Sequence, residues 1–375
     1  MQLVSPEVLL LLIGLALGLA AGVVMHRADY CLAGMFRDFF LFRQHLMLRT
    51  LLLAILASMA LFELARQGGL LPLYPFPLLG PPALTNILGG LLFGVGMVLA
   101  GGCVVGTLYK LGSGSVVSLT AFVGLLVGSA LYAEIHPWWA HIARRCILFP
   151  NSITLPQALQ LSPPLLLWPL VLGGGFCLSR WGRVQGWHRS AAAAAGYLQP
   201  WLAGLWLALL GTLSWVLIGI PLGITTSYAK MAAMGESLLL PQHVAGLPYF
   251  QATPLTMVNP LTGLTLRGGG GPALDGIALV QFPVIAGIVL GAAFSALSLG
   301  EWHLRFRLPP RQYVSAFAGG VLLALASRMT PACNVWHLLG GLPILALQSL
   351  LFLLGLLPGA WLGGRLLTAV VLKTR

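Results

Sequence analysis

The stretch GGLLFGVGMVLAGGCVVGTLYKLGSGS, residues 89–115, decides the fold. An almost wholly apolar segment ends in Gly101 and Gly102 directly before Cys103, so that backbone amides are exposed beside a thiol. At membrane depth, irregular backbone is tolerated only where it lines a cavity or is packed within protein. The stretch therefore predicts a broken membrane helix with a site at the break.

A later stretch repeats this arrangement. The glycine pair 319–320 begins fourteen residues before Cys333, and the pair 89–90 begins at the same distance before Cys103. We therefore expect the chain to use the glycine and cysteine break twice.

The composition is that of a membrane protein. Of 375 residues, 58% are hydrophobic and 7% are charged, so the chain could not stay soluble as a single globule. The net charge of +12 could favour nucleic acid, but the arginines are scattered among short loops and form no basic patch. We therefore expect a lipid bilayer around the chain and no nucleic-acid partner. Glycines at helical spacing, such as Gly14, Gly18 and Gly22, predict close helix packing.

Windows of about twenty apolar residues, the length that crosses the hydrocarbon core, predict nine transmembrane helices. They lie near 6–26, 46–65, 84–108, 115–135, 163–179, 200–220, 276–297, 313–329 and 344–371. Two segments, 27–45 and 223–238, are too polar or too short to span and are expected to be short re-entrant helices. The proline-rich connection 239–275 is expected to be an irregular external loop. The predicted fold class is an all-α polytopic membrane protein.

The basic residues orient these helices. With the N-terminus outside, most of them fall on inner connections and few on outer ones, as the positive-inside rule requires. The inner set comprises Arg27, Arg37, Arg43, Arg49, Lys110, Arg180, Arg183, Arg189, Arg305, Arg307, Arg311, Arg365, Lys373 and Arg375, and the outer set comprises Arg66, Arg144, Arg145, Lys230 and Arg267. We therefore expect a periplasmic N-terminus and a cytoplasmic C-terminus.

This topology divides the chain into three parts. A first half of four helices covers 1–145, a connecting segment with one helix covers 146–199, and a second half of four helices covers 200–375. Because the halves enter the membrane from opposite sides, any repeat between them is inverted. Tyrosine aligns with tyrosine when DYCLAGMFRD at 29–38 is set against SYAKMAAMGE at 227–236. Inverted repeats with glycine-broken segments at matching positions indicate a transporter with a site near the bilayer midplane.

The five cysteines include no CxxC pair, so neither a disulfide framework nor a zinc site is expected. Cys31, Cys103 and Cys333 each lie at a break in an apolar pattern, whereas Cys146 lies in a basic loop and Cys177 in a plain apolar segment. A thiol at membrane depth stays neutral and presents a weak S–H donor on a polarizable atom, which suits a soft sulfur-bearing anion. The chain has no hydrolase or nucleotide-binding motif, and no metal or cofactor is expected.

Basic side chains accompany the three thiols in sequence. Arg37, Lys110 and Arg328 are candidates for a basic path along which an anion moves, because ionisable residues within a membrane are functional candidates by default. The alternative is that these cations only mark topology or pair with nearby carboxylates. The backbone amides of Gly101 and Gly102 are further candidates for contact with the anion.

Two polar residues follow Cys333. The spacing of Asn334 and His337 places the histidine on the same helical face as Cys333, so both are candidates for contact with the ion. For His337 the alternative is a packed core histidine.

At these residues the chain resembles the YeeE/YedE family of sulfur-transport membrane proteins. The matching stretches are CLAGMFRDF (31–39), residues 89–115, PLGITTSYAK (221–230) and ACNVWHLLGGLP (332–343). The resemblance implies an inner-membrane protein with two inverted halves and a narrow constriction, across which three cysteines hand a thiosulfate ion. On the matching positions these are Cys31, Cys103 and Cys333.

The chain departs from the family pattern near the last cysteine. Pro331 and Ala332 stand where glycines are usual, and bulkier residues including Trp336 replace a glycine after the asparagine. This difference bears on pore width and on the substrate, since some relatives are associated with selenium metabolism.

The sequence thus favours a transporter, and not an enzyme, that takes up thiosulfate or a related sulfur anion through a cysteine relay. Cys333 is expected to meet the ion first, then Cys103, then Cys31. A soluble cytoplasmic sulfurtransferase is the expected recipient. Two other classes remain open: a membrane thiol enzyme that carries sulfane sulfur or selenium, and a structural subunit of a larger membrane complex.

Overall fold

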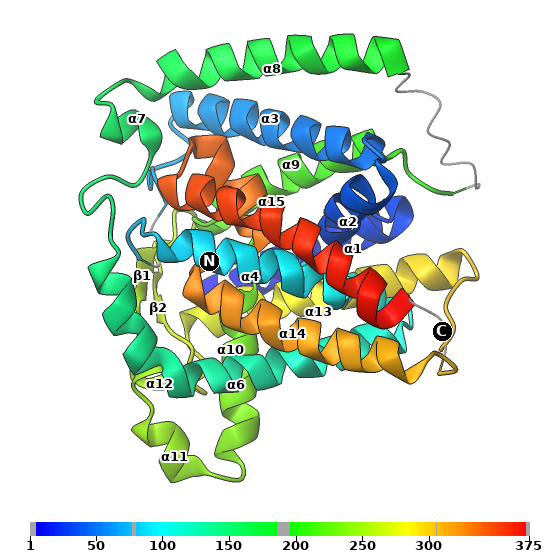
Figure 1. The fold of residues 1–375 in the computed structure, drawn as a ribbon. Coiled ribbons are helices and arrows are strands. Elements are labelled where there is room, and N and C mark those ends of the chain that lie inside the picture. The colour runs from blue at the N-terminus through cyan, green and yellow to red at the C-terminus, as the bar shows by residue number, and fades with distance from the viewer. Residues whose placement is uncertain (1–4, 77–79, 186–195, 305, 373–375) are drawn as a thin grey trace.

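A computed structural model describes residues 5–76, 80–185, 196–304 and 306–372 of the chain. The protein is 73% helical, which confirms the all-α class. Its long helices run side by side in one bundle (Figure 1). They are α1 (Pro6–Ala28), α3 (Leu46–Gln67), α4 (Thr85–Leu99), α6 (Val116–Arg145), α8 (Pro163–Gln185), α9 (Pro200–Ile218), α13 (Gly276–Ser298), α14 (Pro310–Met329) and α15 (Leu347–Leu367). Of the inner basic set, Arg189, Arg305, Lys373 and Arg375 lie outside the described residues.

By length and composition, 8 stretches of the described residues could cross a membrane. Eight of the nine predicted spans are among them, and the exception is 313–329, which forms most of α14. Arg311 and Arg328 near the two ends of this helix lower its hydropathy. The helix nevertheless packs inside the bundle, against α4 and α6 (Figure 1).

Short elements connect the long helices. They are α2 (Leu32–Phe42), α5 (Val104–Gly112), α7 (Leu155–Ala158), α10 (Thr225–Ser237), α11 (Pro241–Gly246), α12 (Pro248–Gln251), a π-helix η1 (Trp336–Gly341), a 3-10 helix η2 (Leu342–Ile344), a π-helix η3 (Thr368–Leu372) and the strands β1 (Leu255–Val258) and β2 (Thr265–Gly268). The short helices predicted in 27–45 and 223–238 are α2 and α10.

The connection 239–275 is more ordered than predicted. It holds α11, α12 and an antiparallel hairpin in which Leu255 of β1 pairs with Gly268 of β2. Pro241 and Pro248 occupy the first turns of α11 and α12, where the missing N–H of proline would have no helical partner in any case. The prolines therefore start helices here, and the prediction of an irregular loop was wrong.

The bundle is built from close helix pairs. The helix α1 packs on α13, α3 on α9, α4 on α15 and α14 on α6. A Cβ atom on Gly18 or Gly22 of α1 would overlap the backbone of α13, so the predicted close packing through glycine is confirmed for this pair. The helix α8 lies apart from the others on the outer side of α3 (Figure 1).

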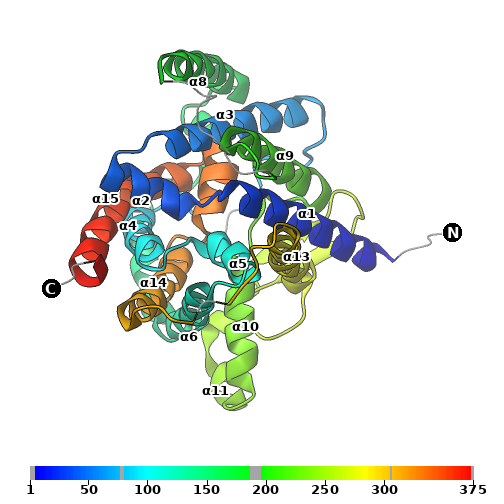
Figure 2. The ribbon, with the colours of Figure 1, turned by 90° about the vertical axis from the view of Figure 1, so that its right-hand side faces the viewer.

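The short helix α5 lies near the centre of the molecule. Figure 2 looks nearly along α6, α13 and α14 and shows α5 among these helices and α1. The predicted break is present, because α4 ends at Leu99 and α5 begins at Val104. The bundle therefore holds a helix start, with its free backbone amides, at its centre.

Candidate functional site

The three cysteines predicted to form the site each directly precede a helix or follow a helix break. Cys31 is the N-cap of α2 and Cys103 is the N-cap of α5, while Cys333 follows the end of α14 and precedes η1. Their exposed fractions are 3%, 0% and 1%, respectively. All three thiols are therefore enclosed in protein at positions where helix amides lack helical partners.

Local geometry fixes the Cys103 thiol at the start of α5. Gly101 has φ 70°, a left-handed conformation that ends α4 and suits glycine. The N–H of Gly106 donates to the Cys103 sulfur at 3.2 Å, and the hydroxyl of Thr107 donates to the Cys103 carbonyl at 2.8 Å. The buried Gly102 completes the turn. The thiol thus lies at the positive end of the helix dipole.

Cys31 and Cys103 approach each other across Gly106. A Cβ atom on Gly106 would lie 3.2 Å from each of the two sulfur atoms. Both thiols therefore border the same small space, which remains open because residue 106 has no side chain. The sequence placed both cysteines at breaks but did not reveal that they meet here.

Cys333 completes the group from the second half of the chain. Cys333 is buried in the same hydrophobic core as Cys31 and Cys103. The fully buried Tyr228 of α10 donates its hydroxyl to the carbonyl of Val104 at 3.1 Å. The structure therefore brings the thiols of Cys31 and Cys103 together and places Cys333 in the same core, with Tyr228 fastening the start of α5.

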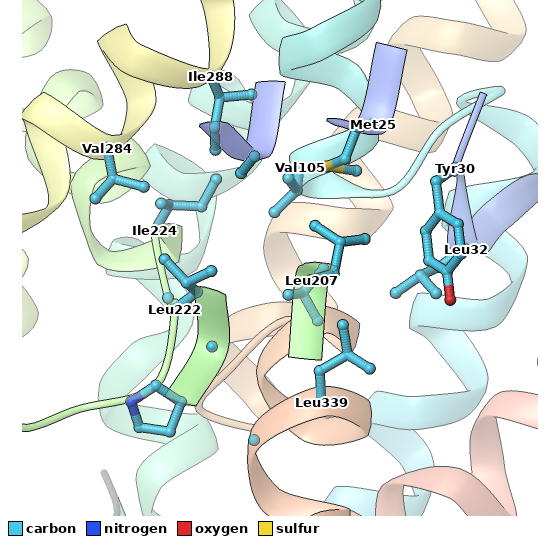
Figure 3. Close-up of a pocket in the computed structure, with 16 residues that line it drawn as sticks. Met25, Tyr30, Leu32, Val105, Leu207, Leu222, Ile224, Val284, Ile288 and Leu339 are labelled. Carbon is cyan, nitrogen blue, oxygen red and sulfur yellow. The ribbon is translucent and has the colours of Figure 1, made fainter. Parts of the chain in front are cut away.

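An apolar cavity adjoins this group (Figure 3). Tyr30 and Leu32, which flank Cys31, line it together with Val105, Val335 and Ile224. Most of the other side chains drawn in Figure 3 are also aliphatic, and the Tyr30 hydroxyl donates to a backbone carbonyl. A small ion in this region would therefore find its polar partners mainly at the helix starts.

The predicted basic path is only partly assembled. Lys110 donates from Nζ to the carbonyl of Gly101 at 2.7 Å, which places a cation on the glycine turn beside Cys103. Arg37 instead forms an ion pair with Asp38 at 2.7 Å. Arg328 is 8% exposed, and it donates to the carbonyl of Thr225. Lys110 and Arg328 thus lie inside or beside the site, whereas Arg37 has a carboxylate partner.

Asn334 and His337 are both fully buried but differ in what they leave free. The Oδ1 atom of Asn334 has no hydrogen-bond partner among the described residues. His337 Nδ1 lies 3.0 Å from Ser349 Oγ, its Nε2 lies 3.0 Å from the Thr330 carbonyl, and its ring stacks on Phe352. The free Oδ1 is an acceptor and cannot bind an anion, so only Nδ2 of Asn334, which donates weakly to Met97 Sδ at 3.9 Å, could contact one. Both His337 nitrogens are engaged by protein groups.

Two further features lie away from the thiols. Cys146 caps the end of α6 and Cys177 is exposed on the outlying α8.

On the surface, His243 Nε2 lies 2.6 Å from Glu134 Oε1 and 3.4 Å from Glu236 Oε1. The hydrogen bond to Glu134 raises the pKa of His243. This ion pair holds α11 against α6, and nothing connects it to the cysteines.

Buried thiols and helix starts, enclosed by long apolar helices, are features of a membrane transport protein. A family model described as sulphur transport matches residues 27–362. The chain therefore belongs to this family of sulfur-transport membrane proteins, and the resemblance to YeeE/YedE proteins is confirmed.

Three relatives of known name are similar to this chain, one over almost its whole length and two over about a third of it. A protein of Spirochaeta thermophila named thiosulfate transporter TsuA is 30% identical over 362 residues, which are 93% of this chain and 98% of that protein. The thiosulfate transporter TsuA of Escherichia coli is 40% identical over 130 residues, 34% of this chain and 35% of its own. The probable transporter YedE of Escherichia coli is 33% identical over 124 residues, 32% of this chain and 29% of its own.

Proposed function

We propose that the protein takes up thiosulfate, or a closely related sulfur anion, from the periplasm to the cytoplasm of a bacterial inner membrane. The ion passes Cys333, then Cys103, then Cys31, and no covalent bond forms. The observation that carries the proposal is the meeting of the buried Cys31 and Cys103 thiols at helix starts beside an apolar cavity, with Cys333 buried in the same core. The thiosulfate transporter that matches almost the whole chain supports the choice of substrate.

The chemistry of the site suits weak, repeated contact with a soft anion. Each neutral thiol offers an S–H donor, and the adjoining helix starts offer backbone amides and a positive dipole end. Fixed cations are few at the thiols themselves, where Lys110 reaches the Gly101 carbonyl. Conduction requires contacts that are strong enough to admit the ion and weak enough to release it. A thiol donor meets this requirement better than a salt bridge would.

The helix pairs support an inverted repeat between residues 1–145 and 200–375, joined by 146–199. In this proposal α1, α3, α4 and α6 correspond to α9, α13, α14 and α15. The packing of α1 on α13 then corresponds to that of α9 on α3, and α4 on α15 corresponds to α14 on α6. The contact of α2 with α15 likewise corresponds to that of α10 with α6. Under this correspondence, Cys103 and Cys333 approach the site from opposite sides.

The orientation gives a first prediction. A reporter that is active only in the cytoplasm is expected to be active when fused after Arg375 and inactive when fused before Met1, because the inner connections carry most of the basic residues. A periplasmic reporter should give the reverse pattern. Cytoplasmic activity at Met1 would remove the proposed direction of the relay.

The two outlying cysteines give a second prediction. Replacing Cys146 and Cys177 together by alanine is expected to change thiosulfate uptake by less than about twofold, because Cys177 is exposed, Cys146 is only half-buried and neither lies at the thiol group. Uptake per folded protein should be measured in cells that lack their own sulfur importers. A loss of uptake larger than the loss of folded protein would show that these thiols belong to the pathway.

One specific observation favours a second candidate, a membrane thiol enzyme. Cys31 and Cys103 border the same space at Gly106, as a functional thiol pair would. In such an enzyme a Cys103 thiolate would attack the sulfane sulfur of thiosulfate, form a persulfide and release sulfite. Transport remains the better supported proposal, because both thiols are enclosed and flanked by apolar side chains.

Uptake by whole cells tests the proposed function. Thiosulfate, sulfite, sulfate and selenite should be offered separately to cells that lack their own importers and express this chain. We expect uptake of thiosulfate above that of the other three. No uptake of any sulfur anion, with the protein folded in the membrane, would contradict the proposal. Delivery to a cytoplasmic sulfurtransferase is a further step that this assay leaves aside.

A further inference from the structure

A second cavity opens at the left-hand end of the bundle in Figure 1, where α4 begins and α6 and α14 end. Arg144 and His136 of α6 line it together with Arg328 of α14, and Thr85 and Asn86 contribute from the start of α4. We call this cavity the arginine vestibule. It was not apparent in the sequence, because its cationic residues come from segments that are far apart in the chain.

Arg328 is the innermost cation of the arginine vestibule and is incompletely satisfied. Its side chain is more than nine-tenths buried, and its Nη2 donates to the carbonyl of Thr225. Its Nε is buried and has no partner among the described residues. A buried guanidinium without a carboxylate partner is costly, and an anion supplied from outside would offset that cost.

The rest of the lining adds positive charge or neutral polar groups. No acidic side chain of the described residues lines the vestibule. Glu134, which lies close in sequence to His136, is held by His243 on the surface. Nδ1 of His136 lies 3.3 Å from the Tyr132 hydroxyl, so this histidine is tied to a neutral neighbour. Within the described part of the chain, the vestibule is therefore a cationic recess without an acidic side chain in its lining.

The vestibule leads towards Cys333. Pro331, two residues before Cys333, lines the vestibule and also a neighbouring cavity whose lining includes the polar side chains of Thr225, Thr226 and Gln281. This neighbouring cavity in turn shares Pro221 and Gly223 with the apolar cavity beside the thiols. An anion held near Arg328 would therefore lie at the start of a series of adjoining cavities.

We propose that the arginine vestibule is an outer binding site for a tetrahedral divalent sulfur oxyanion, and that it loads the ion before the ion reaches Cys333. Arg144 attracts the ion at the mouth, and Arg328 holds it at the inner end. This inference rests on the proposed transport function and adds a binding site and a selecting step to it. Thiosulfate and sulfate are both tetrahedral divalent sulfur oxyanions, so both bind in the vestibule. The thiols beyond it select between the two ions.

The test compares Arg144→Gln with Arg145→Gln, which removes the neighbouring exposed arginine that does not line the vestibule. In reconstituted vesicles, Arg144→Gln is expected to raise the KM for thiosulfate about fivefold with little change in maximal rate. A change of this size corresponds to the loss of one charge contact that is partly screened by solvent. Arg145→Gln should leave KM within about twofold, and Arg144→Lys should restore most of the loss. Sulfate should compete with thiosulfate in the unaltered protein, and more weakly in Arg144→Gln.

Direct binding separates this inference from the proposed function. Titration calorimetry of the solubilised protein with sulfate, with thiosulfate and with chloride as control should show oxyanion binding that Arg144→Gln weakens. Binding of this kind without any influx would contradict the transport proposal and leave the vestibule standing. Normal influx, with KM and oxyanion affinity equal in Arg144→Gln and Arg145→Gln, would overturn the vestibule.

Discussion

Replacing Cys103 by alanine is expected to abolish thiosulfate uptake. Its thiol lies at the start of α5, faces Cys31 across Gly106 and is buried in the same core as Cys333. Every ion that moves from one half of the protein to the other would contact it. A hydrogen bond to a charged group contributes about 1.5–3 kcal/mol. Its loss at the narrowest step would lower the rate by about tenfold to a hundredfold, to near the background of the assay.

The serine variant and a matched control make this result specific. Cys103→Ser keeps an O–H donor but replaces sulfur with a smaller and less polarizable atom, so uptake is expected to be severely impaired but measurable. Cys177→Ala, on the exposed face of α8, is the control and should transport normally. Both Cys103 variants should insert and fold, because each substitution removes volume without burying charge. If Cys103→Ala transports at nearly the unaltered rate, the thiols are not the path and the helix amides alone carry the ion.

Replacing Gly106 by alanine is expected to reduce uptake about tenfold. The added methyl carbon would lie 3.2 Å from the sulfurs of both Cys31 and Cys103, a distance at which neither thiol can stay in place without a shift. Adding a methylene to a tightly packed site costs typically 1–3 kcal/mol. Here it would also fill the space that both thiols border, through which the ion is proposed to pass.

Gly175→Ala is the matched control for this substitution. Gly175 also lies within a helix, and a Cβ atom there would have no neighbour within 4 Å among the described residues. Its uptake should equal that of the unaltered protein, and thermal unfolding of both variants should be compared in detergent. Full uptake by Gly106→Ala would show that the space between Cys31 and Cys103 is not on the path.

Much of the fold could be predicted from local pattern. The break before Cys103 followed from Gly101 and Gly102 at the end of an apolar run, since glycine ends a helix readily. The short helices α2 and α10 were predicted because their segments are too polar or too short to span. The connection 239–275 was misjudged, because the same proline that breaks a helix from inside is favoured in its first turn.

The site could be predicted only in part, because its decisive features are contacts between distant segments. No local pattern shows that Gly106 separates the thiols of Cys31 and Cys103, or that Tyr228 donates to the Val104 carbonyl. The pairing of Tyr228 with Tyr30 in the two aligned stretches was the only signal available. The spacing placed His337 beside Cys333, but tertiary contacts occupy both of its ring nitrogens.

The central claim, passage of an intact ion without a covalent step, is tested most directly with doubly labelled thiosulfate. The purified protein in vesicles should receive thiosulfate with ³⁵S in the sulfane position and ¹⁸O in the sulfonate group, and the vesicle contents should be analysed after rapid filtration. We predict that both labels arrive inside in the same molecule, at equal rates, and that no ³⁵S remains on the protein. Arrival or protein attachment of ³⁵S without the ¹⁸O-labelled sulfonate would contradict the account and establish the thiol enzyme.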